Sequence, residues 1–247
     1  MIPLVLVHGF MGGSDQWEPQ SPLKNTVPLI AVDLPGFGKN AHLTPINSIE
    51  KLARWVLDKL TDQGVERFLL LGHSMGGMVV QDMIRQAPDR VARLVLYSTG
   101  ALGLLPGRFE PIETSMQRTK DDGAKATARR IAATWFLHRE NAKAYPACAA
   151  IAECSSPDAI QAGLEAMRDW SGEDSLSSIS APTLVIWGDQ DRTYPWPQIQ
   201  TLWQSVPESS LAVIPGCAHA VHLEEPEIFN HLIGRFVSER QIIEQKK

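Results

Sequence analysis

A serine enclosed by glycines, Gly72–Gly77 (GHSMGG), directly follows the apolar run Phe68–Leu71 and opens a segment of helical pattern, Met75–Gln86. This order of strand, turn and helix predicts a nucleophile elbow, a sharp turn that projects a serine hydroxyl away from the backbone. The glycines two residues on either side of Ser74 are expected where strand and helix approach too closely for a Cβ atom. The alternative is a glycine-rich turn with a passive serine, and the partners of the serine decide between the two.

Such a serine needs a general base, because an alcohol is barely ionised at neutral pH, and a carboxylate that orients the base. After an elbow serine these groups follow in the order acid, then histidine. Two aspartates follow a buried strand predicted at Thr183–Trp187, and two histidines follow the last predicted strand. They are Asp189, Asp191, His219 and His222. The residues alone leave either aspartate as the acid and either histidine as the base.

Together these motifs resemble the α/β-hydrolase superfamily, in its lid-bearing serine esterase and lactonase branch, and are similar to 3-oxoadipate enol-lactonase and pimeloyl-carrier-protein methyl esterase. The resemblance covers the chain from Leu4 to about Val237. It implies that Asp191 is the acid and His219 the base, while His222 packs or caps before a helix predicted at Glu225–Glu239. The motifs that carry it are VHGF at 7–10, DLPGFG at 33–38, GHSMGG at 72–77, GDQD at 188–191 and HAVHLE at 219–224.

Two backbone N–H groups must also point at the developing oxyanion, one after the nucleophile and one after an earlier strand. The candidates are Met75 and Phe10, the latter in a glycine-rich loop that follows the predicted strand Leu4–Val7. That loop contains neither G-x-G-x-x-G nor a P-loop lysine, which argues against dinucleotide binding. The mechanism requires no metal and no organic cofactor. The resemblance implies structural roles for His8 and Asp33.

Strands alternate with helices along the chain and indicate an α/β fold, a doubly wound and mostly parallel sheet of about six strands. In the family topology the first strand lies between the second and third, and the family's two N-terminal hairpin strands are expected to be missing. A clear helix is predicted at Ser48–Gln63, with Ser48 as its cap. The strands are expected at Leu4–Val7, Leu29–Val32, Phe68–Leu71, Leu94–Tyr97, Thr183–Trp187 and Leu211–Ile214.

Residues 100–180 interrupt the strand pattern and predict a helical lid inserted into a hydrolase core of residues 1–99 and 181–247. Its helices are expected near 110–120, 122–136, 142–152 and 157–170. Aromatic side chains there could line an apolar substrate pocket, although aromatic residues at helical spacing more often form a core. The candidates are Trp135, Phe136, Tyr145, Met167 and Trp170, with Val221 from the loop after the base.

Basic residues in the predicted lid could bind the carboxylate or phosphate of an acidic substrate. The competing interpretation is a solvated helix face balanced by neighbouring acids. The basic residues are Arg108, Arg118, Lys120, Lys125, Arg129, Arg130, Arg139 and Lys143. The acids are Glu110, Glu113, Asp121, Asp122 and Glu140.

Charge and cysteine content restrict the partners. The formal net charge of −5 over 247 residues, with acids and bases interspersed, argues against a nucleic-acid partner. The apolar run Ile2–Val7 is too short for a signal peptide or a membrane span, so we expect a cytoplasmic protein that does not bind membranes. Cys148, Cys154 and Cys217 form no C-x-x-C motif and are expected to be reduced thiols. The oligomeric state cannot be read from the sequence.

These features predict a serine hydrolase that cleaves a carboxylic ester through an acyl-enzyme, with a small-molecule ester or lactone as substrate. Within this class the alternatives are an enol-lactonase, or a methyl esterase that acts on an acidic carrier protein. Carbon–carbon bond hydrolysis and cofactor-free peroxidation are further alternatives. A different class is a hydrolase-like ligand receptor with slow turnover, which the intact triad disfavours.

Overall fold

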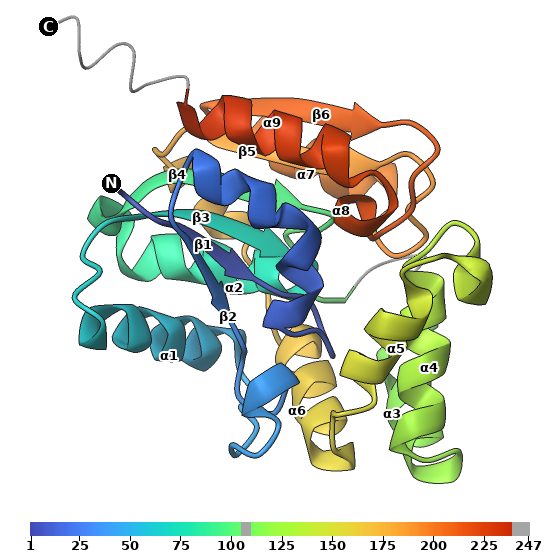
Figure 1. The fold of residues 1–247 in the computed structure, drawn as a ribbon. Coiled ribbons are helices and arrows are strands. Elements are labelled where there is room, and N and C mark those ends of the chain that lie inside the picture. The colour runs from blue at the N-terminus through green and yellow to red at the C-terminus, as the bar shows by residue number, and fades with distance from the viewer. Residues whose placement is uncertain (105–109, 239–247) are drawn as a thin grey trace, which may run out of the picture.

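The computed structural model describes residues 1–104 and 110–238, and a six-stranded parallel sheet lies at its centre (Figure 1). The strand order is β2-β1-β3-β4-β5-β6, so the first strand lies between the second and third, as predicted. The winding direction reverses at this point, which opens a crevice at the carboxyl ends of the strands. The strands are β1 (Leu4–Val7), β2 (Leu29–Val32), β3 (Phe68–His73), β4 (Val91–Tyr97), β5 (Thr183–Gly188) and β6 (Ser209–Ile214).

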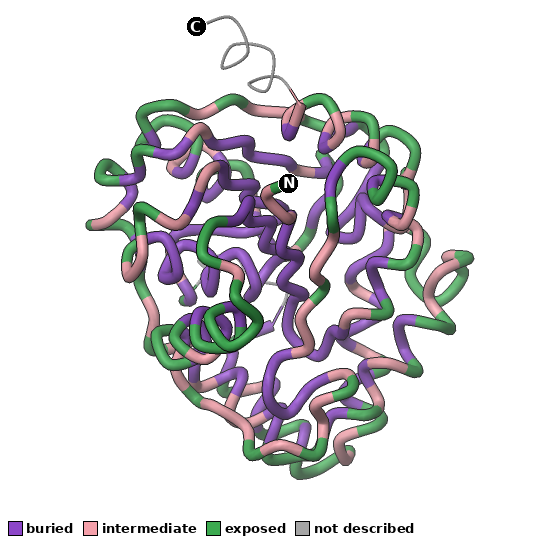
Figure 2. The backbone as a smooth tube through the Cα atoms, turned by 60° about the vertical axis from the view of Figure 1, so that its left-hand side comes forward, coloured by how far each residue is buried: buried purple, intermediate pink, exposed green. Residues whose placement is uncertain are grey.

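Both faces of the sheet are covered by helices, as the continuous apolar strands require. Successive strand residues point to opposite faces. Val5 and Val7 therefore pack toward α1 (Ile49–Asp62), α2 (Met75–Gln86) and α7 (Trp196–Ser205), which share one apolar cluster with them. Leu4 and Leu6 pack on the other face, against the 3₁₀ segment η1 (Ser14–Asn25) and α9 (Pro226–Ser238). Figure 2 shows that the buried backbone is concentrated along the strands between these layers.

The helix predicted at Ser48–Gln63 is confirmed as α1. Ser48 is its cap, as predicted, because its hydroxyl accepts a hydrogen bond from the Lys51 N–H at 3.3 Å. The last long helix begins at Pro226, and its expected end at Glu239 lies outside the described residues. A separate short helix, α8 (Val221–Glu224), precedes it, so His222 lies within a helix rather than in the turn before one. The remaining 3₁₀ segments are η2 (Gly38–Asn40), η3 (Pro88–Arg90), η4 (Arg139–Asn141) and η5 (Glu173–Ser178).

Helix α7 and the segment η1 were not predicted. Pro195 and Pro197 flank the start of α7. Two prolines so close together suggest a loop, although proline is compatible with the first turn of a helix. Segment η1 contains Pro19 and Pro22 and adopts the tighter 3₁₀ form. In both cases tertiary packing onto the sheet overrides a sequence that lacks strong helix signals.

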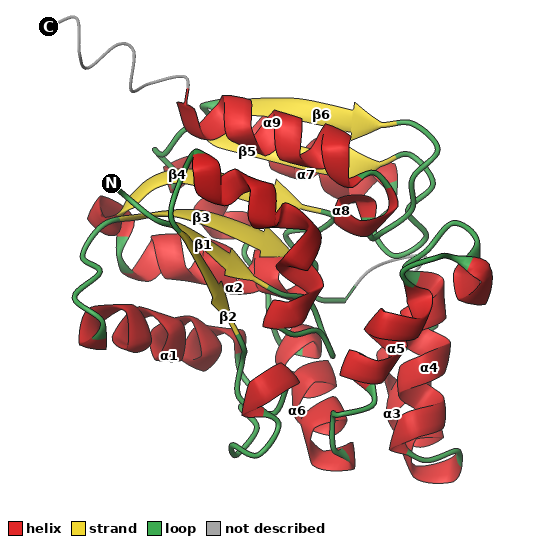
Figure 3. Cartoon of the chain, viewed as in Figure 1, coloured by secondary structure: helices red, strands yellow, loops and turns green. Residues whose placement is uncertain are grey.

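Four helices between β4 and β5 lie beyond the carboxyl ends of the strands (Figures 1 and 3), and we call them the inserted helices. Three of the four begin two or three residues later than predicted, the first of them at Ile112. Gly123, with a φ of 84°, delays the second until Ala124, and Pro146 lies in the first turn of the third, which begins at Tyr145. The inserted helices are α3 (Ile112–Asp121), α4 (Ala124–Thr134), α5 (Tyr145–Ala152) and α6 (Pro157–Arg168).

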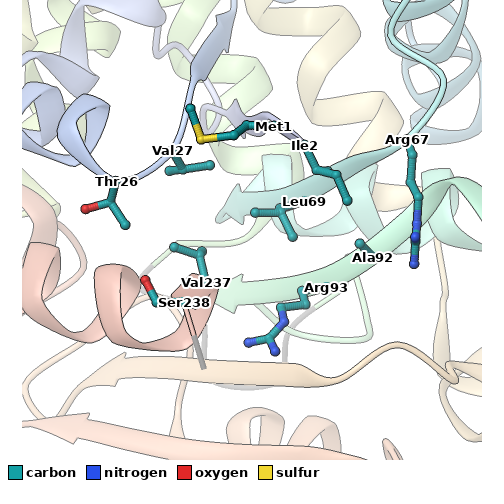
Figure 4. Close-up of a pocket in the computed structure, with 10 residues that line it drawn as sticks. All are labelled: Met1, Ile2, Thr26, Val27, Arg67, Leu69, Ala92, Arg93, Val237 and Ser238. Atoms are coloured by element: carbon teal, nitrogen blue, oxygen red, sulfur yellow. The ribbon is translucent and has the colours of Figure 1, made fainter. Parts of the chain in front are cut away.

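A cavity of about 160 Å³ lies at the opposite, amino-terminal ends of the strands (Figure 4). Its lining includes Leu69 near the start of β3 and Arg93 near the start of β4. Because catalytic residues in open α/β sheets gather at the carboxyl ends, this cavity is separate from the predicted site. Across residues 1–104 and 110–238, no helix has the length and apolar character needed to cross a bilayer.

Candidate active site

Ser74 occupies the junction between β3 and α2 in a conformation that L-residues rarely adopt, with φ of 56° and ψ of −121°. Backbone strain of this kind persists only where the surroundings hold it, and it clusters at functional sites. The Ser74 N–H donates to the Tyr97 carbonyl at 3.0 Å, and the Thr99 hydroxyl donates to the Ser74 carbonyl at 2.8 Å. These two hydrogen bonds hold the turn on both sides of the serine. The strand–turn–helix geometry is the one expected of a nucleophile elbow, and the role of Ser74 as the nucleophile stays a prediction.

The glycines around Ser74 are required by close backbone approach. A Cβ atom on Gly72 would lie 2.3 Å from the Gly76 carbonyl oxygen, and one on Gly76 would lie 2.3 Å from the Val7 carbonyl oxygen. Real Cβ atoms do not approach oxygen this closely, so any side chain would push β1, β3 and α2 apart. The pair of glycines thus brings the end of β1 against the start of α2.

The loop after β1 lies against the serine. A Cβ atom on Gly9 would be 3.0 Å from the Ser74 Cβ, and the Gly12 N–H donates to the Gly9 carbonyl at 3.0 Å to close a tight turn. Phe10 is the next residue in this turn. Met75 is the first residue of α2, where backbone N–H groups have no acceptor within the helix. Met75 therefore directly follows Ser74 in sequence, and Phe10 directly follows a residue that lies against Ser74.

His8 and Asp33 hold this loop rather than face the serine. The Leu34 N–H donates to His8 Nε2 at 3.0 Å, so the proton is on Nδ1, which donates to the Gly9 carbonyl at 2.7 Å. Burial lowers the pKa of His8 and keeps the ring neutral. Asp33 Oδ1 accepts from the Ser14 N–H at 2.8 Å.

The structure joins His219 to Asp191. The His219 Nδ1 lies 2.9 Å from Asp191 Oδ2, and both side chains are buried. A carboxylate only accepts, so Nδ1 carries the proton and Nε2 is left with a free lone pair. The other carboxylate oxygen, Oδ1, accepts from the Thr193 N–H at 2.7 Å and the Tyr194 N–H at 3.3 Å. The carboxylate is thereby fixed before any substrate arrives.

The two alternative residues have other partners. Asp189 Oδ1 accepts from the Gly216 N–H at 2.7 Å, and the residue is exposed. His222 is buried, with Nδ1 3.0 Å from the Tyr97 hydroxyl. Its ring lies 4.7 Å from that of Trp17, within the core on the α9 face of the sheet. Asp191 and His219 therefore form a hydrogen-bonded pair, whereas Asp189 and His222 are each bonded to other residues.

A cluster of aromatic and imidazole rings surrounds the His219 loop, and sequence reasoning missed its role. The His219 carbonyl accepts from the Tyr97 hydroxyl and from His73 Nε2, each at 3.0 Å. The ring of Tyr194 stacks on His219 at 5.7 Å, and that of His73, the residue before Ser74, lies 4.6 Å from it. These contacts hold the His219 loop against His73, which directly precedes Ser74. Tyr97 ends β4 at the carboxyl edge of the sheet, which is the one sequence signal that could have identified it.

Trp135, Phe136, Tyr145 and Val221 occupy different surroundings. Trp135 and Phe136 are buried at the end of α4, and the Phe136 ring meets the half-buried Tyr145 edge-on at 6.5 Å. Val221 is fully buried in the apolar cluster that contains Trp17. Contact of these four side chains with substrate stays a prediction.

Several basic residues of the inserted helices are engaged in ion pairs. Arg118 and Arg130 pair with Glu110, at 3.2 and 2.9 Å, and Arg129 pairs with Glu153. Glu110 was predicted as a balancing acid, whereas Glu153 was not. Arg108 lies outside the described residues. The exposed basic residues include Lys120, Lys125, Arg139 and Lys143.

Two of the three cysteine thiols, those of Cys148 and Cys217, are poorly suited to act as nucleophiles. Cys148, Cys154 and Cys217 are all free, and Cys217 lies two residues before His219. Burial raises the pKa of Cys217 to about 12 and that of Cys148 to about 11, so both remain protonated thiols. Within residues 1–104 and 110–238, no three His, Cys, Asp or Glu side chains gather as a metal site would require.

Acid is expected to destabilise the fold through the buried histidines. Burial lowers the pKa of His73, and lowers that of His222 from 6.5 to about 3. The folded state thus keeps His222 neutral while the unfolded chain takes up a proton below pH 6.5, so its contribution is complete above pH 6.5 and is lost as the pH falls toward 3. We expect the free energy of unfolding to fall by about 1.4 kcal/mol per pH unit for each such histidine.

Guanidinium unfolding at a series of pH values measures this slope. His222→Asn, whose amide retains a donor near the Tyr97 hydroxyl, is expected to make the slope shallower, although it lowers stability at neutral pH. His42→Gln serves as the control, because His42 is exposed. An equal slope in the wild type and in His222→Asn would contradict the prediction.

The sequence of this chain is similar to that of a known protein family and to several of its members. The sequence matches the model of the Alpha/beta hydrolase family over residues 4–232. It is 27% identical over 242 residues to a pimeloyl-[acyl-carrier protein] methyl ester esterase of Legionella pneumophila (strain Corby), covering 96% of this chain and 95% of the relative. It is 30% identical over 239 residues to the protein of the same name from Aromatoleum aromaticum, covering 91% and 93%.

The fold itself is shared with solved structures. The crystal structure of the enol-lactonase from Burkholderia xenovorans LB400 has a TM-score of 0.87 to this chain, covering 96% of this chain and 92% of that one. The sequence identity is 22%, so this likeness concerns the fold alone.

Proposed function

Since this chain belongs to the alpha/beta hydrolase family, we propose that it is a carboxylic ester hydrolase with a triad of Ser74, His219 and Asp191. The observation that carries the proposal is the buried Asp191–His219 hydrogen bond, which the structure combines with a serine in elbow conformation. The relatives named as methyl ester esterases support the same reaction class.

In the proposed mechanism the Ser74 Oγ attacks the ester carbonyl carbon, and His219 Nε2 takes the hydroxyl proton. The negative charge that develops on the carbonyl oxygen is stabilised by the N–H groups of Phe10 and Met75. The intermediate collapses, the C–O bond to the alcohol breaks, and the His219 imidazolium returns its proton to the departing alkoxide. Water then attacks the acyl-enzyme with His219 as the base, which releases the acid and restores Ser74.

Asp191 has a different task in this mechanism. Its carboxylate keeps the His219 proton on Nδ1, so Nε2 presents a lone pair to the serine. It also stabilises the imidazolium that forms in each half-reaction. The two backbone N–H groups on Oδ1 stop the carboxylate from rotating away.

We assign the inserted helices, within residues 100–180, to a lid over this site, and residues 1–99 and 181–247 to the hydrolase core. Two contacts support the assignment. A Cβ atom on Gly163 of α6 would lie 2.7 Å from the Phe10 ring, and one on Gly13 would lie 3.2 Å from Ile151 of α5. These helices therefore rest directly on the loop that carries the Phe10 amide, where they restrict access to the serine.

A methyl ester on an acidic carrier protein is the second candidate substrate. The relatives that are pimeloyl-[acyl-carrier protein] methyl ester esterases favour it, as do the exposed basic side chains of the lid, among them Lys125, Arg139 and Lys143. Hydrolysis of a carrier-bound ester should then weaken at high salt, since these attractions are screened. A small-molecule ester without charge should show no such loss.

Hydrolysis of p-nitrophenyl esters with acyl chains of two to twelve carbons tests the proposed function. We expect many turnovers per enzyme, with a chain-length optimum that reflects the size of the pocket under the lid. A single burst of product without turnover would contradict an esterase and favour a ligand receptor. Lactones and acidic methyl esters, tested under the same conditions, separate the substrate classes.

A further inference from the structure

The turn that follows α4, residues 135–137, lies against the loop that carries His219, although the two are far apart in sequence. The Ala220 N–H donates to the Trp135 carbonyl at 2.9 Å. Ala220 directly follows the proposed base. The end of the second inserted helix is thus hydrogen-bonded to the base loop.

Glu224 joins the same two segments with one carboxylate. Its Oε1 accepts from the Leu137 N–H at 2.7 Å, and its Oε2 accepts from the Ala218 N–H at 2.7 Å. Ala218 directly precedes His219, so Glu224 and Ala220 anchor the loop on both sides of the base. Hydrogen bonds from N–H groups to a carboxylate are stronger than those between neutral groups. The half-buried position of Glu224 limits competition from water.

The acid loop reaches the turn as well. Arg192, the residue after Asp191, directs Nη1 to the Phe136 carbonyl at 3.2 Å and Nη2 to the Leu137 carbonyl at 3.4 Å. The turn after α4 is therefore linked to the acid loop through Arg192 and to the base loop through Glu224. Any movement of the turn would act on both members of the Asp191–His219 pair.

Packing holds this junction from one side only, where Trp135 and Phe136 are buried. A cavity of about 350 Å³ lies beside it, and its lining includes Leu137, Lys143, Cys217 and Glu224. A turn next to such a cavity lacks close-packed neighbours on that side. Its position consequently depends on directional hydrogen bonds, of which the Glu224 carboxylate makes two.

We propose that Glu224 is a positioning residue that fixes the His219 loop against the turn after α4 and thereby couples the lid to the base. This inference rests on the proposed function and concerns how the same site is regulated. Glu224 acts through the backbone at Ala218 and Leu137, not through substrate contact. Its loss should therefore lower kcat with little change in KM.

The kinetic test compares Glu224→Ala and Glu224→Gln with the wild type on p-nitrophenyl butyrate. We expect kcat to fall by about 10- to 100-fold in both variants, because displacement of a catalytic group by about 1 Å costs this much. Glutamine is included because it keeps the size of the side chain but can accept from only one of the two N–H groups. KM should stay within about twofold. Glu225→Gln is the matched control, since the adjacent Glu225 is exposed.

Hydrogen exchange provides a readout that needs no substrate. In Glu224→Ala the amides of Leu137 and Ala218 should exchange at least tenfold faster, whereas amides of β3 should not change. A double-mutant cycle with Arg192→Ala should give non-additive losses of kcat, because both side chains hold the same turn.

Three results would overturn the positioning role. They are an unchanged kcat in both Glu224 variants, a rise in KM that accounts for the whole loss of kcat/KM, or unchanged exchange at Ala218. If the wild type hydrolyses no ester, the proposed function fails, while the exchange rates still decide whether Glu224 joins the two segments.

Discussion

Replacement of Ser74 by alanine is expected to lower kcat for p-nitrophenyl butyrate by about 10⁴-fold or more, because the three residues of a triad work as a unit. Without Oγ no acyl-enzyme can form, and His219 and Asp191 have no proton to move. The residual rate would come from the oxyanion-binding amides and from binding alone. Alanine removes one oxygen from a residue that is 7% exposed, so the strained turn should keep its shape.

A second serine at the same edge of the sheet provides the control. Ser98 follows β4, is fully buried, and its hydroxyl has no hydrogen-bond partner within the described residues. Ser98→Ala should therefore retain both the fold and the activity. A fluorophosphonate probe should add its mass to the Ser74 peptide in the wild type and in Ser98→Ala. Labelling at another residue, or full activity in Ser74→Ala, would rule out Ser74 as the nucleophile.

The sheet was predictable because its signals are local. Short apolar runs such as Leu4–Val7 and Phe68–Leu71 are buried on both faces, and a strand of this kind needs no knowledge of its neighbours to be identified. The position of the first strand between the second and third came from the family resemblance, and the observed order confirms it. Strand ends were less accurate, since β3 continues through Gly72 and His73 to the serine.

The choice between neighbouring candidates was not available from local signals. Asp189 and Asp191 follow the same strand, and only the resemblance favoured one of them. In the structure a two-residue displacement along the loop directs Asp191 inward to His219 and Asp189 outward to the Gly216 N–H. Side-chain direction in an irregular loop depends on its hydrogen bonds, which leave no periodic trace in the sequence.

Long-range contacts were the hardest to predict. Tyr97 belonged to a predicted strand, and Glu224 belonged to the HAVHLE motif at 219–224. The sequence assigned neither residue a role. Each residue forms a hydrogen bond to a segment that is distant in sequence. Tyr97 donates to the His219 carbonyl, and Glu224 accepts from the Leu137 N–H. A single sequence does not encode such pairs in any pattern that can be recognised before the chain is folded.

Asparagine substitutions at the two aspartates are expected to differ by orders of magnitude. Asp191→Asn should lower kcat by about 10⁴-fold, the size of loss known for an aspartate-to-asparagine change in a serine triad. Asp189→Asn should lower it by less than about tenfold, since Asp189 is exposed and accepts one hydrogen bond, from Gly216, which an asparagine oxygen can also accept. Steady-state kinetics on p-nitrophenyl butyrate measures both, and equal losses would contradict the assignment of the acid.

The two substitutions are expected to differ because Asp191 uses both of its carboxylate oxygens as hydrogen-bond acceptors. At Asp191 one carboxylate oxygen accepts from the N–H groups of Thr193 and Tyr194, and the other accepts from His219 Nδ1. Asparagine has a single acceptor oxygen, which the two backbone N–H groups would retain, so its NH₂ group would face His219. The imidazole would then keep its lone pair on Nδ1 and carry its proton on Nε2, where it could not accept the proton of Ser74. The variant should fold like the wild type and yet lose activity, because the same atoms would hold His219 in the wrong tautomer.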